Sequence, residues 1–306
     1  MKWIIDTDPG IDDAAAIVAA VRSGMDVIGL TTVAGNSPLT STTRNALRLV
    51  ELLDVPVPVF EGAEQPLLEP SRYAPEVHGE DGFGDCGLPE PRRQAERLPA
   101  ADFISQSAAQ YGDGLAILAV GPLTNLALAI AKERKATRRI QRIVLMGGTS
   151  DGRGNTTMTG EFNVRFDPEA AAIVFNSGIP ITMVPWETCL KALLRPAQLE
   201  PLERSDRPLA QVFTKMTRTL VDRVEAALGF RGLVLCDLLA TAAIVDPDVV
   251  TEQVEAYVAV ETAGSIGRGM TAVDYMWLSG REPNARVCLN VDVERIAGLL
   301  VRSFTV

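Results

Sequence analysis

Four aspartates lie within eight residues near the start of the chain: Asp6, Asp8, Asp12 and Asp13. They follow a short apolar run, and a Pro-Gly turn separates them into two pairs, so a strand, a tight turn and a helix are expected over residues 3–23. Carboxylates held this close repel one another unless a cation lies among them. Part of the cluster has a simpler explanation, because aspartate is common in the first turn of a helix.

Carboxylate oxygens with no histidine or cysteine beside them favour a hard cation, Ca²⁺ or Mg²⁺. The acidic turn is too short for an EF-hand loop and lacks its D-x-D-x-D-G spacing, so a metal here needs ligands from elsewhere in the chain. Asp237 is a candidate, because it is the single acid in the apolar run 235–242. An unpaired carboxylate among apolar neighbours is costly, which leaves three roles for Asp237: metal ligand, helix N-cap or salt-bridge partner.

Predicted strands alternate with predicted helices along most of the chain. This alternation favours a parallel sheet with right-handed crossovers, and no linker divides residues 1–306. The predicted fold is therefore a single α/β domain, a mainly parallel, Rossmann-like open sheet flanked by helices. Strands are expected at residues 3–5, 25–34, 57–60, 115–120, 142–146, 179–184, 253–261, 271–277 and 286–291, and helices at 11–23, 38–53, 99–111, 208–228, 235–242, after Pro122, after Asp167 and at the C-terminus.

Ligands of parallel α/β sheets gather at the carboxyl ends of the strands. Asp8 and Asn36 come just after two consecutive predicted strands. A long irregular stretch, residues 61–98, contains His78, the only histidine of the chain. Long loops in compact domains are often functional, although a single loop histidine is also commonly just solvated.

A second polar loop follows the predicted strand 142–146. Its glycine-rich composition is that of a flexible connector, but its place at a strand end of a regular sheet is where a substrate pocket is usually built. This loop carries Asn155, Glu161, Phe162 and Asn163.

Composition excludes several classes of protein. The chain has 306 residues, is 47% hydrophobic and 22% charged, and carries a net charge of −10. That charge argues against binding to nucleic acid or to an anionic membrane. The four cysteines form no C-x-x-C pair, which suggests reduced thiols in the cytoplasm. We also expect no signal peptide and no membrane span, because Met1 leads directly into the first strand and no apolar run is long enough.

The string Asp6-Thr7-Asp8-Pro9-Gly10-x-Asp12-Asp13 resembles the inosine–uridine-preferring nucleoside hydrolase family. Further motifs occur in that family's order, densely over residues 3–185 and afterwards mainly around Asp237. They are Val33-Ala34-Gly35-Asn36, His78-Gly79, Gly121-Pro122-Leu123-Thr124-Asn125-Leu126-Ala127, Met146-Gly147-Gly148, Glu161-Phe162-Asn163 and Asp167-Pro168-Glu169-Ala170-Ala171.

The resemblance implies hydrolysis of the N-glycosidic bond of ribonucleosides, with Asp8 as general base. It implies a Ca²⁺ ion held by Asp8, Asp13, Asp237 and the backbone carbonyl of Val120. It also implies a small-molecule ribonucleoside as partner, a role in purine or pyrimidine salvage, and a homodimer or homotetramer. Substrate would contact Asp12, Asn36, His78, Met146, Asn155, Glu161, Phe162 and Asn163, with Met146 and Phe162 near the ribose and base and the acids and amides on the sugar hydroxyls.

Cys236 departs from the family pattern, in which a histidine often precedes the last aspartate ligand. A thiol with an ordinary pKa of about 8.5 is a poor substitute for imidazole as a proton donor. A tyrosine, His78 or a chain of water molecules would then protonate the leaving base, or the preferred nucleoside differs. The alternative is that Cys236 is a buried structural cysteine.

Two other functions fit parts of the pattern. A non-catalytic ribose- or nucleoside-binding relative is compatible with Cys236, although such a protein has no evident need of Asp8. A Mg²⁺-dependent aspartyl-phosphate phosphatase would use Asp6 as nucleophile and Asp8 as acid. That class needs a later acidic pair, whereas Asp85 stands without a second acid.

Overall fold

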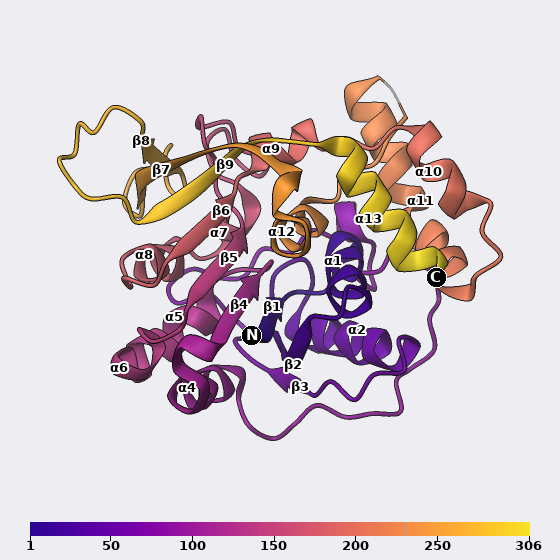
Figure 1. Ribbon diagram of the computed structural model, residues 1–306, viewed down its shortest axis with the longest axis horizontal. Coiled ribbons are helices and arrows are strands. Elements are labelled where there is room, and N and C mark those ends of the chain that lie inside the picture. The colour runs from indigo at the N-terminus through magenta and orange to yellow at the C-terminus, as the bar shows by residue number, and fades with distance from the viewer. Residues whose placement is uncertain (230) are drawn as a thin grey trace.

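The computed structural model describes residues 1–229 and 231–306. One sheet of nine strands, in the order β3-β2-β1-β4-β5-β6-β9-β7-β8, runs through this part of the chain (Figure 1). In this order, every neighbouring pair of strands from β3 to β9 is parallel. Strand β7 pairs antiparallel with both β9 and β8. The strands are β1 (Lys2–Thr7), β2 (Asp26–Thr32), β3 (Val59–Glu61), β4 (Leu115–Ala119), β5 (Arg142–Met146), β6 (Ile181–Val184), β7 (Val250–Val260), β8 (Thr271–Asp274) and β9 (Ala285–Val291).

Helices cover both faces of the sheet (Figure 1). Two short 3₁₀ turns, Gly112–Gly114 and Pro247–Val249, precede β4 and β7. The helices are α1 (Ile11–Arg22), α2 (Leu39–Leu52), α3 (Pro75–His78), α4 (Ala100–Tyr111), α5 (Thr124–Lys132), α6 (Arg134–Thr137), α7 (Phe162–Phe166), α8 (Pro168–Phe175), α9 (Trp186–Lys191), α10 (Pro196–Glu203), α11 (Pro208–Leu228), α12 (Cys236–Val245) and α13 (Val293–Thr305).

Alternate residues of each central strand enter different cores, as the two-residue period of a strand requires. Ile5 and Leu118 pack with α1, α2 and α12 on one face. Ile4 and Ile117 pack with α4, α5 and α8 on the other. All of these side chains are fully buried, so both faces of the sheet are covered, as is typical of parallel sheets.

The chain reverses its direction of winding between β1 and β4. Strand β1 pairs with β2 on one side and with β4 on the other. The helices after β1 and β2 lie on one face, and those after β4 and β5 lie on the opposite face. This arrangement opens a crevice at the carboxyl ends of β1 and β4, where open α/β sheets bind ligands. Asp8 follows β1 and Val120 follows β4.

The predicted fold class is confirmed, and the differences are local. The irregular stretch 61–98 contains one short helix, α3, which ends at His78. Strand β8 stops at Asp274, three residues before the predicted end. It stops there because the Asp274 carboxylate accepts hydrogen bonds from the backbone N–H groups of Leu278 and Ser279, at 2.8 and 2.7 Å, and so turns the chain.

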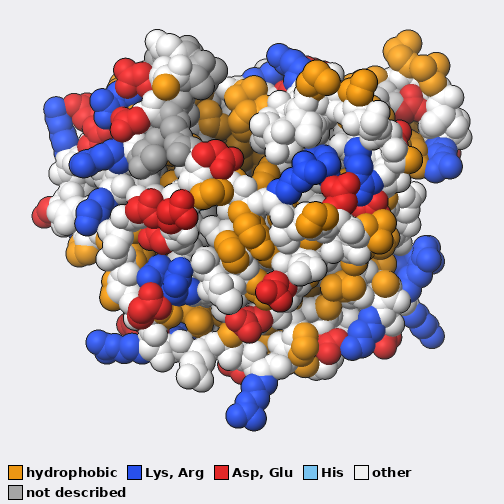
Figure 2. All heavy atoms as spheres, turned by 180° about the vertical axis from the view of Figure 1, so that it is seen from behind, with side chains coloured by type: hydrophobic (Ala, Val, Ile, Leu, Met, Phe, Trp, Pro, Cys, Tyr) orange, Lys and Arg blue, Asp and Glu red, His pale blue; other side chains and the backbone are white. Residues whose placement is uncertain are grey.

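Acidic and basic side chains are interspersed over the face shown in Figure 2, with no continuous basic area. Among the described residues, no helix is both long and apolar enough to cross a bilayer.

Candidate active site

A cavity of about 460 Å³ lies at the carboxyl ends of the central strands. Two of the predicted metal ligands, Val120 and Asp237, line this cavity. The other two, Asp8 and Asp13, are fully buried and are not part of its wall. Every residue predicted to contact substrate lines this one cavity: Asp12, Asn36, His78, Met146, Asn155, Glu161, Phe162 and Asn163.

Hydrogen bonds hold the Asp13 carboxylate rigidly beneath the acidic turn. Its Oδ1 accepts from the Thr7 hydroxyl at 2.5 Å and from the Asp8 N–H at 3.2 Å. Its Oδ2 accepts from the Gly10 N–H at 2.9 Å and from the Asn36 amide at 3.1 Å. Four donors around one buried carboxylate fix its position before any ligand binds.

Asp8 has one anchored oxygen and one without a partner. Its Oδ2 accepts from the Asn36 N–H at 2.7 Å. Its Oδ1 is buried and has no hydrogen-bond partner. A Cβ on Gly121 would lie 2.6 Å from this Oδ1, and a Cβ on Gly35 would collide with Oδ2. The glycines of two of the sequence motifs therefore let the chain pass close to Asp8.

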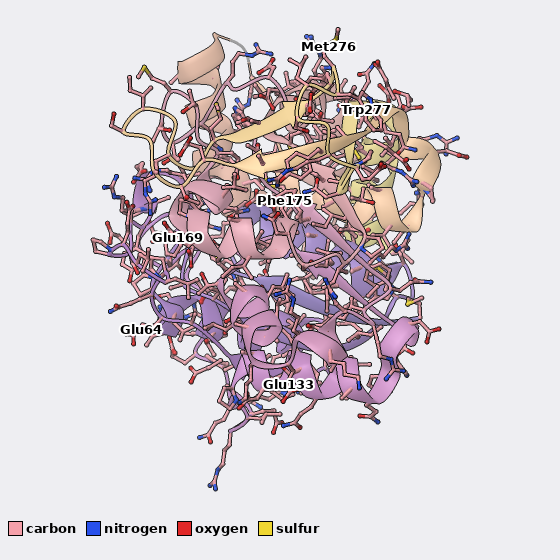
Figure 3. All side chains as sticks on the ribbon, turned by 90° about the vertical axis from the view of Figure 1, so that its left-hand side faces the viewer. Glu64, Glu133, Glu169, Phe175, Met276 and Trp277 are labelled. Atoms are coloured by element: carbon pink, nitrogen blue, oxygen red, sulfur yellow. The ribbon has the colours of Figure 1, made fainter. Side chains whose placement is uncertain are left out.

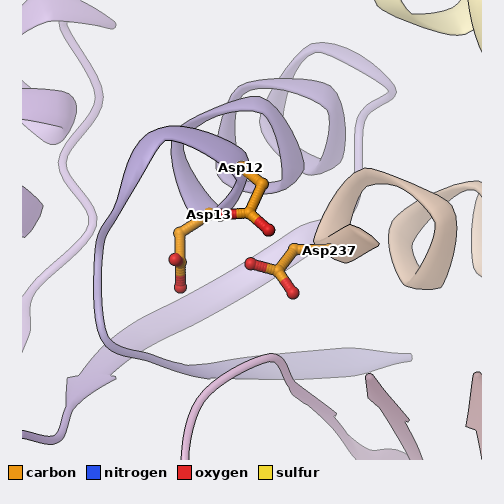
Figure 4. Close-up of side chains that lie close together, drawn as sticks. All are labelled: Asp12, Asp13 and Asp237. Carbon is orange, nitrogen blue, oxygen red and sulfur yellow. The ribbon is translucent and has the colours of Figure 1, made fainter. Parts of the chain in front are cut away.

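Asp12, Asp13 and Asp237 bring their carboxylates together from the start of α1 and the start of α12 (Figure 4). One oxygen from each lies within 4.8 Å of the others. Asp12 Oδ1 is, like Asp8 Oδ1, buried without a partner. None of the three forms an ion pair within the described residues. Unpartnered buried oxygens in an oxygen-only cluster are what a hard cation requires, so these residues fit Ca²⁺.

The three carboxylates that lie closest together are not the three that the resemblance implied as ligands. Asp12, which was expected on the sugar, belongs to the close trio, and Asp8 stands beside it. Asp237 is 3% exposed and lies inside α12, whose N-cap is Leu235. The N-cap and salt-bridge explanations of Asp237 therefore find no support among the described residues.

Burial raises the pKa of every carboxyl in this cluster, and repulsion between the carboxylates adds to the rise for Asp8, Asp13 and Asp237. Burial raises the pKa of Asp12 and Asp13 to about 6, and the charge of Asp12 adds to the effect on Asp13. Burial, with the charges of Asp13 and of Asp12 respectively, raises the pKa of Asp8 and of Asp237 well above the usual value of a carboxyl. A bound cation would reverse these shifts, because it favours the ionised form.

Glu161 organises the opposite wall. It caps α7 by accepting from the N–H groups of Asn163 and Val164, and it accepts from the Gly148 N–H at 2.7 Å. Burial raises its pKa to about 7. The Asn163 amide donates to the carbonyl of Val120 at 3.0 Å, which leaves that carbonyl a second lone pair for another partner.

His78 is 6% exposed, so the solvated alternative is wrong. Its Nδ1 accepts a hydrogen bond from the Ile11 N–H at 3.3 Å. The neutral ring therefore carries its proton on Nε2.

Cys236 lines the cavity and is 7% exposed. A hydrogen bond with the thiol of Cys189 and burial both hold the pKa of Cys236 well above its usual value. The side chain therefore remains a neutral thiol at pH 7, which agrees with the alternative of a buried structural cysteine.

Asp6 is fully buried and does not line the cavity. Its Oδ1 accepts from the Thr31 hydroxyl at 2.6 Å and from the Asn125 amide at 2.8 Å. Thr31 and Asn125 thus hold Asp6 from neighbouring elements, and Asp6 is not one of the three carboxylates that converge at the cavity. The nucleophile of the phosphatase alternative therefore finds no support in this site.

Several lining residues had no signal strong enough for the sequence analysis. The sequence analysis could have found Trp186, because this residue follows β6 at the same edge of the sheet as Asp8. The others come from a loop and from helices whose approach to the cavity is a tertiary event. This apolar and aromatic set is Tyr73, Val77, Trp186, Leu190, Leu220 and Val234.

Comparison with known proteins gives a consistent set of relatives. The profile of the family described as inosine-uridine preferring nucleoside hydrolase matches residues 3–297. A non-specific ribonucleoside hydrolase RihC from Klebsiella pneumoniae is 41% identical over 292 residues, which is 95% of this chain and 94% of the relative. RihC from Salmonella enteritidis is also 41% identical, covering 95% of this chain and 93% of the relative.

Solved structures agree in fold. A plant nucleoside hydrolase, PpNRh1, superposes with a TM-score of 0.93 at 34% identity, covering 99% of this chain and 98% of that one. A purine-preferring ribonucleoside hydrolase from Gardnerella vaginalis gives a TM-score of 0.93 at 33% identity, covering 100% of this chain and 98% of that one.

Proposed function

The chain belongs to the inosine-uridine preferring nucleoside hydrolase family and hydrolyses the N-glycosidic bond of ribonucleosides, and we propose that it does so with a bound Ca²⁺ ion and with Asp8 as general base. The observation that carries the proposal is the pair of buried, unpartnered oxygens, Asp8 Oδ1 and Asp12 Oδ1, beside a trio of carboxylates. Such oxygens are costly unless a cation and a substrate complete the site.

The ion would be held by Asp8, Asp13 and Asp237, with Asp12 close enough to join them and the Val120 carbonyl at the edge. When bound, it would neutralise the carboxylates, orient the sugar hydroxyls and make a water molecule more acidic. Asp8 would then take the proton of the attacking water at Oδ1, the oxygen that no protein donor occupies.

Cleavage of the glycosidic bond builds positive charge on the ribose, as in other glycosyl transfers. The carboxylates around the cavity stabilise that charge. The same cavity is lined by Asn36, Asn155, Glu161 and Asn163, and we propose that these residues hold the ribose hydroxyls. Asn155 is itself oriented, because its Oδ1 accepts from the Phe162 N–H at 2.9 Å.

The leaving base must gain a proton or depart as a stabilised anion. The buried thiol of Cys236 is a weak acid and a poor donor. His78 is a poor donor as well, because its Nδ1 accepts from the Ile11 N–H, so the ring is neutral and holds its Nε2 proton more tightly than a thiol holds its own. We infer that water molecules in the cavity carry the proton to the leaving base. Tyr73, which also lines the cavity, is the second candidate.

We also propose that both purine and pyrimidine ribonucleosides are accepted. Much of the remaining wall is apolar and includes Trp186, Leu190 and Val234. Apolar and aromatic side chains pack on any base but do not read its hydrogen-bond pattern. The RihC relatives are named non-specific, whereas two solved relatives are named purine-preferring and inosine-guanosine. A role in nucleoside salvage, a cytoplasmic location and a homodimeric or homotetrameric state stay predictions.

The test is release of reducing sugar from inosine, adenosine, uridine and cytidine, by the wild type, by Asp8→Ala and by a chelated sample. We expect turnover on all four, abolished by the substitution and by chelation and restored by added Ca²⁺. Restoration by Mg²⁺ but not by Ca²⁺ would contradict the choice of metal. Absence of turnover with Ca²⁺ bound would instead indicate the nucleoside-binding alternative. A phosphate monoester serves as the negative control.

A further inference from the structure

Three segments that are distant in the sequence meet at Glu69. It lies in the loop 62–74, which follows β3, and its two carboxylate oxygens contact different partners. Oε2 accepts from Arg165 Nη1, on α7, at 2.7 Å. Oε1 accepts from Arg268 Nε, in the connection between β7 and β8, at 2.6 Å. One carboxylate thus joins the first, middle and last parts of the chain.

Two of these segments form the wall of the cavity. The loop 62–74 contributes Arg72 and Tyr73, and α7 contributes Phe162 and Asn163. The third segment, the β7–β8 connection, contributes no residue to the cavity wall.

The β7–β8 connection is packed tightly against α7 and α8. Arg268 also forms an ion pair with Glu169 on α8, at 2.8 Å, and Glu169 is labelled in Figure 3. A Cβ on Gly269 would lie 2.7 Å from the Cα atom of Arg165. The hydroxyl of Thr159, in the loop that carries Asn155, donates to the carbonyl of Ile266 at 2.9 Å. The β7–β8 connection is therefore fixed in place, and through Arg268 it fixes the carboxylate of Glu69.

The ion pairs of Glu69 are better sheltered than ordinary surface pairs. The side chains of Glu69, Arg165 and Arg268 are 28%, 14% and 17% exposed. Two charge-assisted hydrogen bonds on one half-buried carboxylate orient it strongly, whereas exposed pairs contribute little.

We propose that Glu69 is a positioning residue for substrate binding, which latches the loop carrying Arg72 and Tyr73 to α7 and to the β7–β8 connection. The inference rests on the proposed function, since it assigns the latch to the nucleoside site. Loss of the latch weakens binding of the nucleoside and leaves the chemical step intact. Asp8 and Asp13 keep their geometry, because Thr7 and Asn36 hold them independently.

The test compares the kinetics of Glu69→Gln, Arg268→Met and the double variant. We expect KM for inosine to rise at least fivefold in each single variant, with kcat within twofold of the wild type. The double variant should raise KM by less than the product of the two single effects, because both single variants break the shared Glu69–Arg268 pair. The matched control is Glu255→Gln, which breaks the exposed pair with Arg286 on the sheet, at 3.1 Å and away from the cavity.

The proposal would be overturned if KM rose less than twofold, or if kcat fell by the same factor as KM rose. It would also be overturned if the rise in KM of the double variant equalled the product of the two single effects. Melting temperatures identify a variant that fails to fold, and Glu69→Asp, which retains the charge on a shorter side chain, then replaces Glu69→Gln in the comparison.

A second measurement separates the latch from the proposed function. Arg72 is exposed and lies in the latched loop, so trypsin can cleave after it once the loop opens. With added Ca²⁺, cleavage after Arg72 should be at least fivefold faster in Glu69→Gln than in the wild type or in Glu255→Gln. Equal rates would refute the latch even if nucleosides are hydrolysed. Faster cleavage would support it even if the wild type hydrolysed none.

Discussion

Removal of the metal should make the protein less stable as the pH rises. In the metal-free protein, burial raises the pKa of Asp12 and Asp13 to about 6, from the ordinary value of 3.8. A carboxyl whose folded-state pKa is raised contributes stability below its unfolded pKa and loses it as the pH rises through the folded one. The loss of stability therefore falls between about pH 4 and pH 7, and somewhat less than half of it falls above pH 5.

The size of the effect follows from the shift. One carboxyl with a pKa of about 6 loses about 1.4 kcal/mol of stability between pH 5 and pH 7.5. Because Asp12 and Asp13 are coupled, we take the contribution of one as the lower bound. For a chain of this length 1 kcal/mol corresponds to about 2 °C in Tm, so the chelated protein should lose at least about 3 °C over this range.

The assay is thermal unfolding of chelated and Ca²⁺-saturated samples in the same buffers. The difference in Tm between the two cancels the titration of groups outside the site, and it should widen as the pH rises, since Ca²⁺ requires ionised ligands. A difference that stays constant or shrinks from pH 5 to pH 7.5 would show that the buried carboxylates do not form a cation site.

Three substitutions test single contacts. Asp8→Asn should lower kcat about 10³-fold in the reducing-sugar assay. Its Tm should change little, because Oδ1 of Asp8 has no hydrogen-bond partner to lose. Activity within tenfold of the wild type would exclude Asp8 as the general base. Gly121→Ala should reduce kcat at least tenfold, since the new Cβ would meet Asp8 Oδ1 at 2.6 Å, whereas the control Gly267→Ala, whose Cβ would meet its nearest atom at 3.4 Å, should be silent. Trp186→Ala should raise KM at least fivefold for purine and pyrimidine nucleosides alike, as measured by initial rates. The control Trp277→Ala, at an exposed position (Figure 3), should leave KM unchanged. An effect on one class of base alone would show that Trp186 selects between bases.

The local pattern of residues along the chain was sufficient to predict the fold class. Strand and helix periods, with glycine and proline at their ends, are properties of neighbouring residues. The alternation therefore predicted a parallel sheet, and the strand-end rule pointed to Asp8 and Asn36. The cluster of aspartates likewise indicated a hard-cation site, because charge repulsion among Asp6, Asp8, Asp12 and Asp13 depends only on their spacing.

The membership of the site was decided by tertiary structure. Spacing alone could not separate Asp6, whose Oδ1 is bound by Thr31 and Asn125, from Asp8, whose carboxylate lies against Gly35 and Gly121. It also could not place Asp12 beside Asp237, since that contact exists only because α12 packs against α1.

The same limit explains why Tyr73 and Leu220 were missed. Tyr73 lies far along the loop that follows β3, and Leu220 lies in the middle of α11. Both reach the cavity only through the packing of that loop and that helix over it. Short-range patterning determined which chemistry the chain carries. The long-range packing that buries these groups together determined which residues take part, because burial sets both their distances and their pKa values.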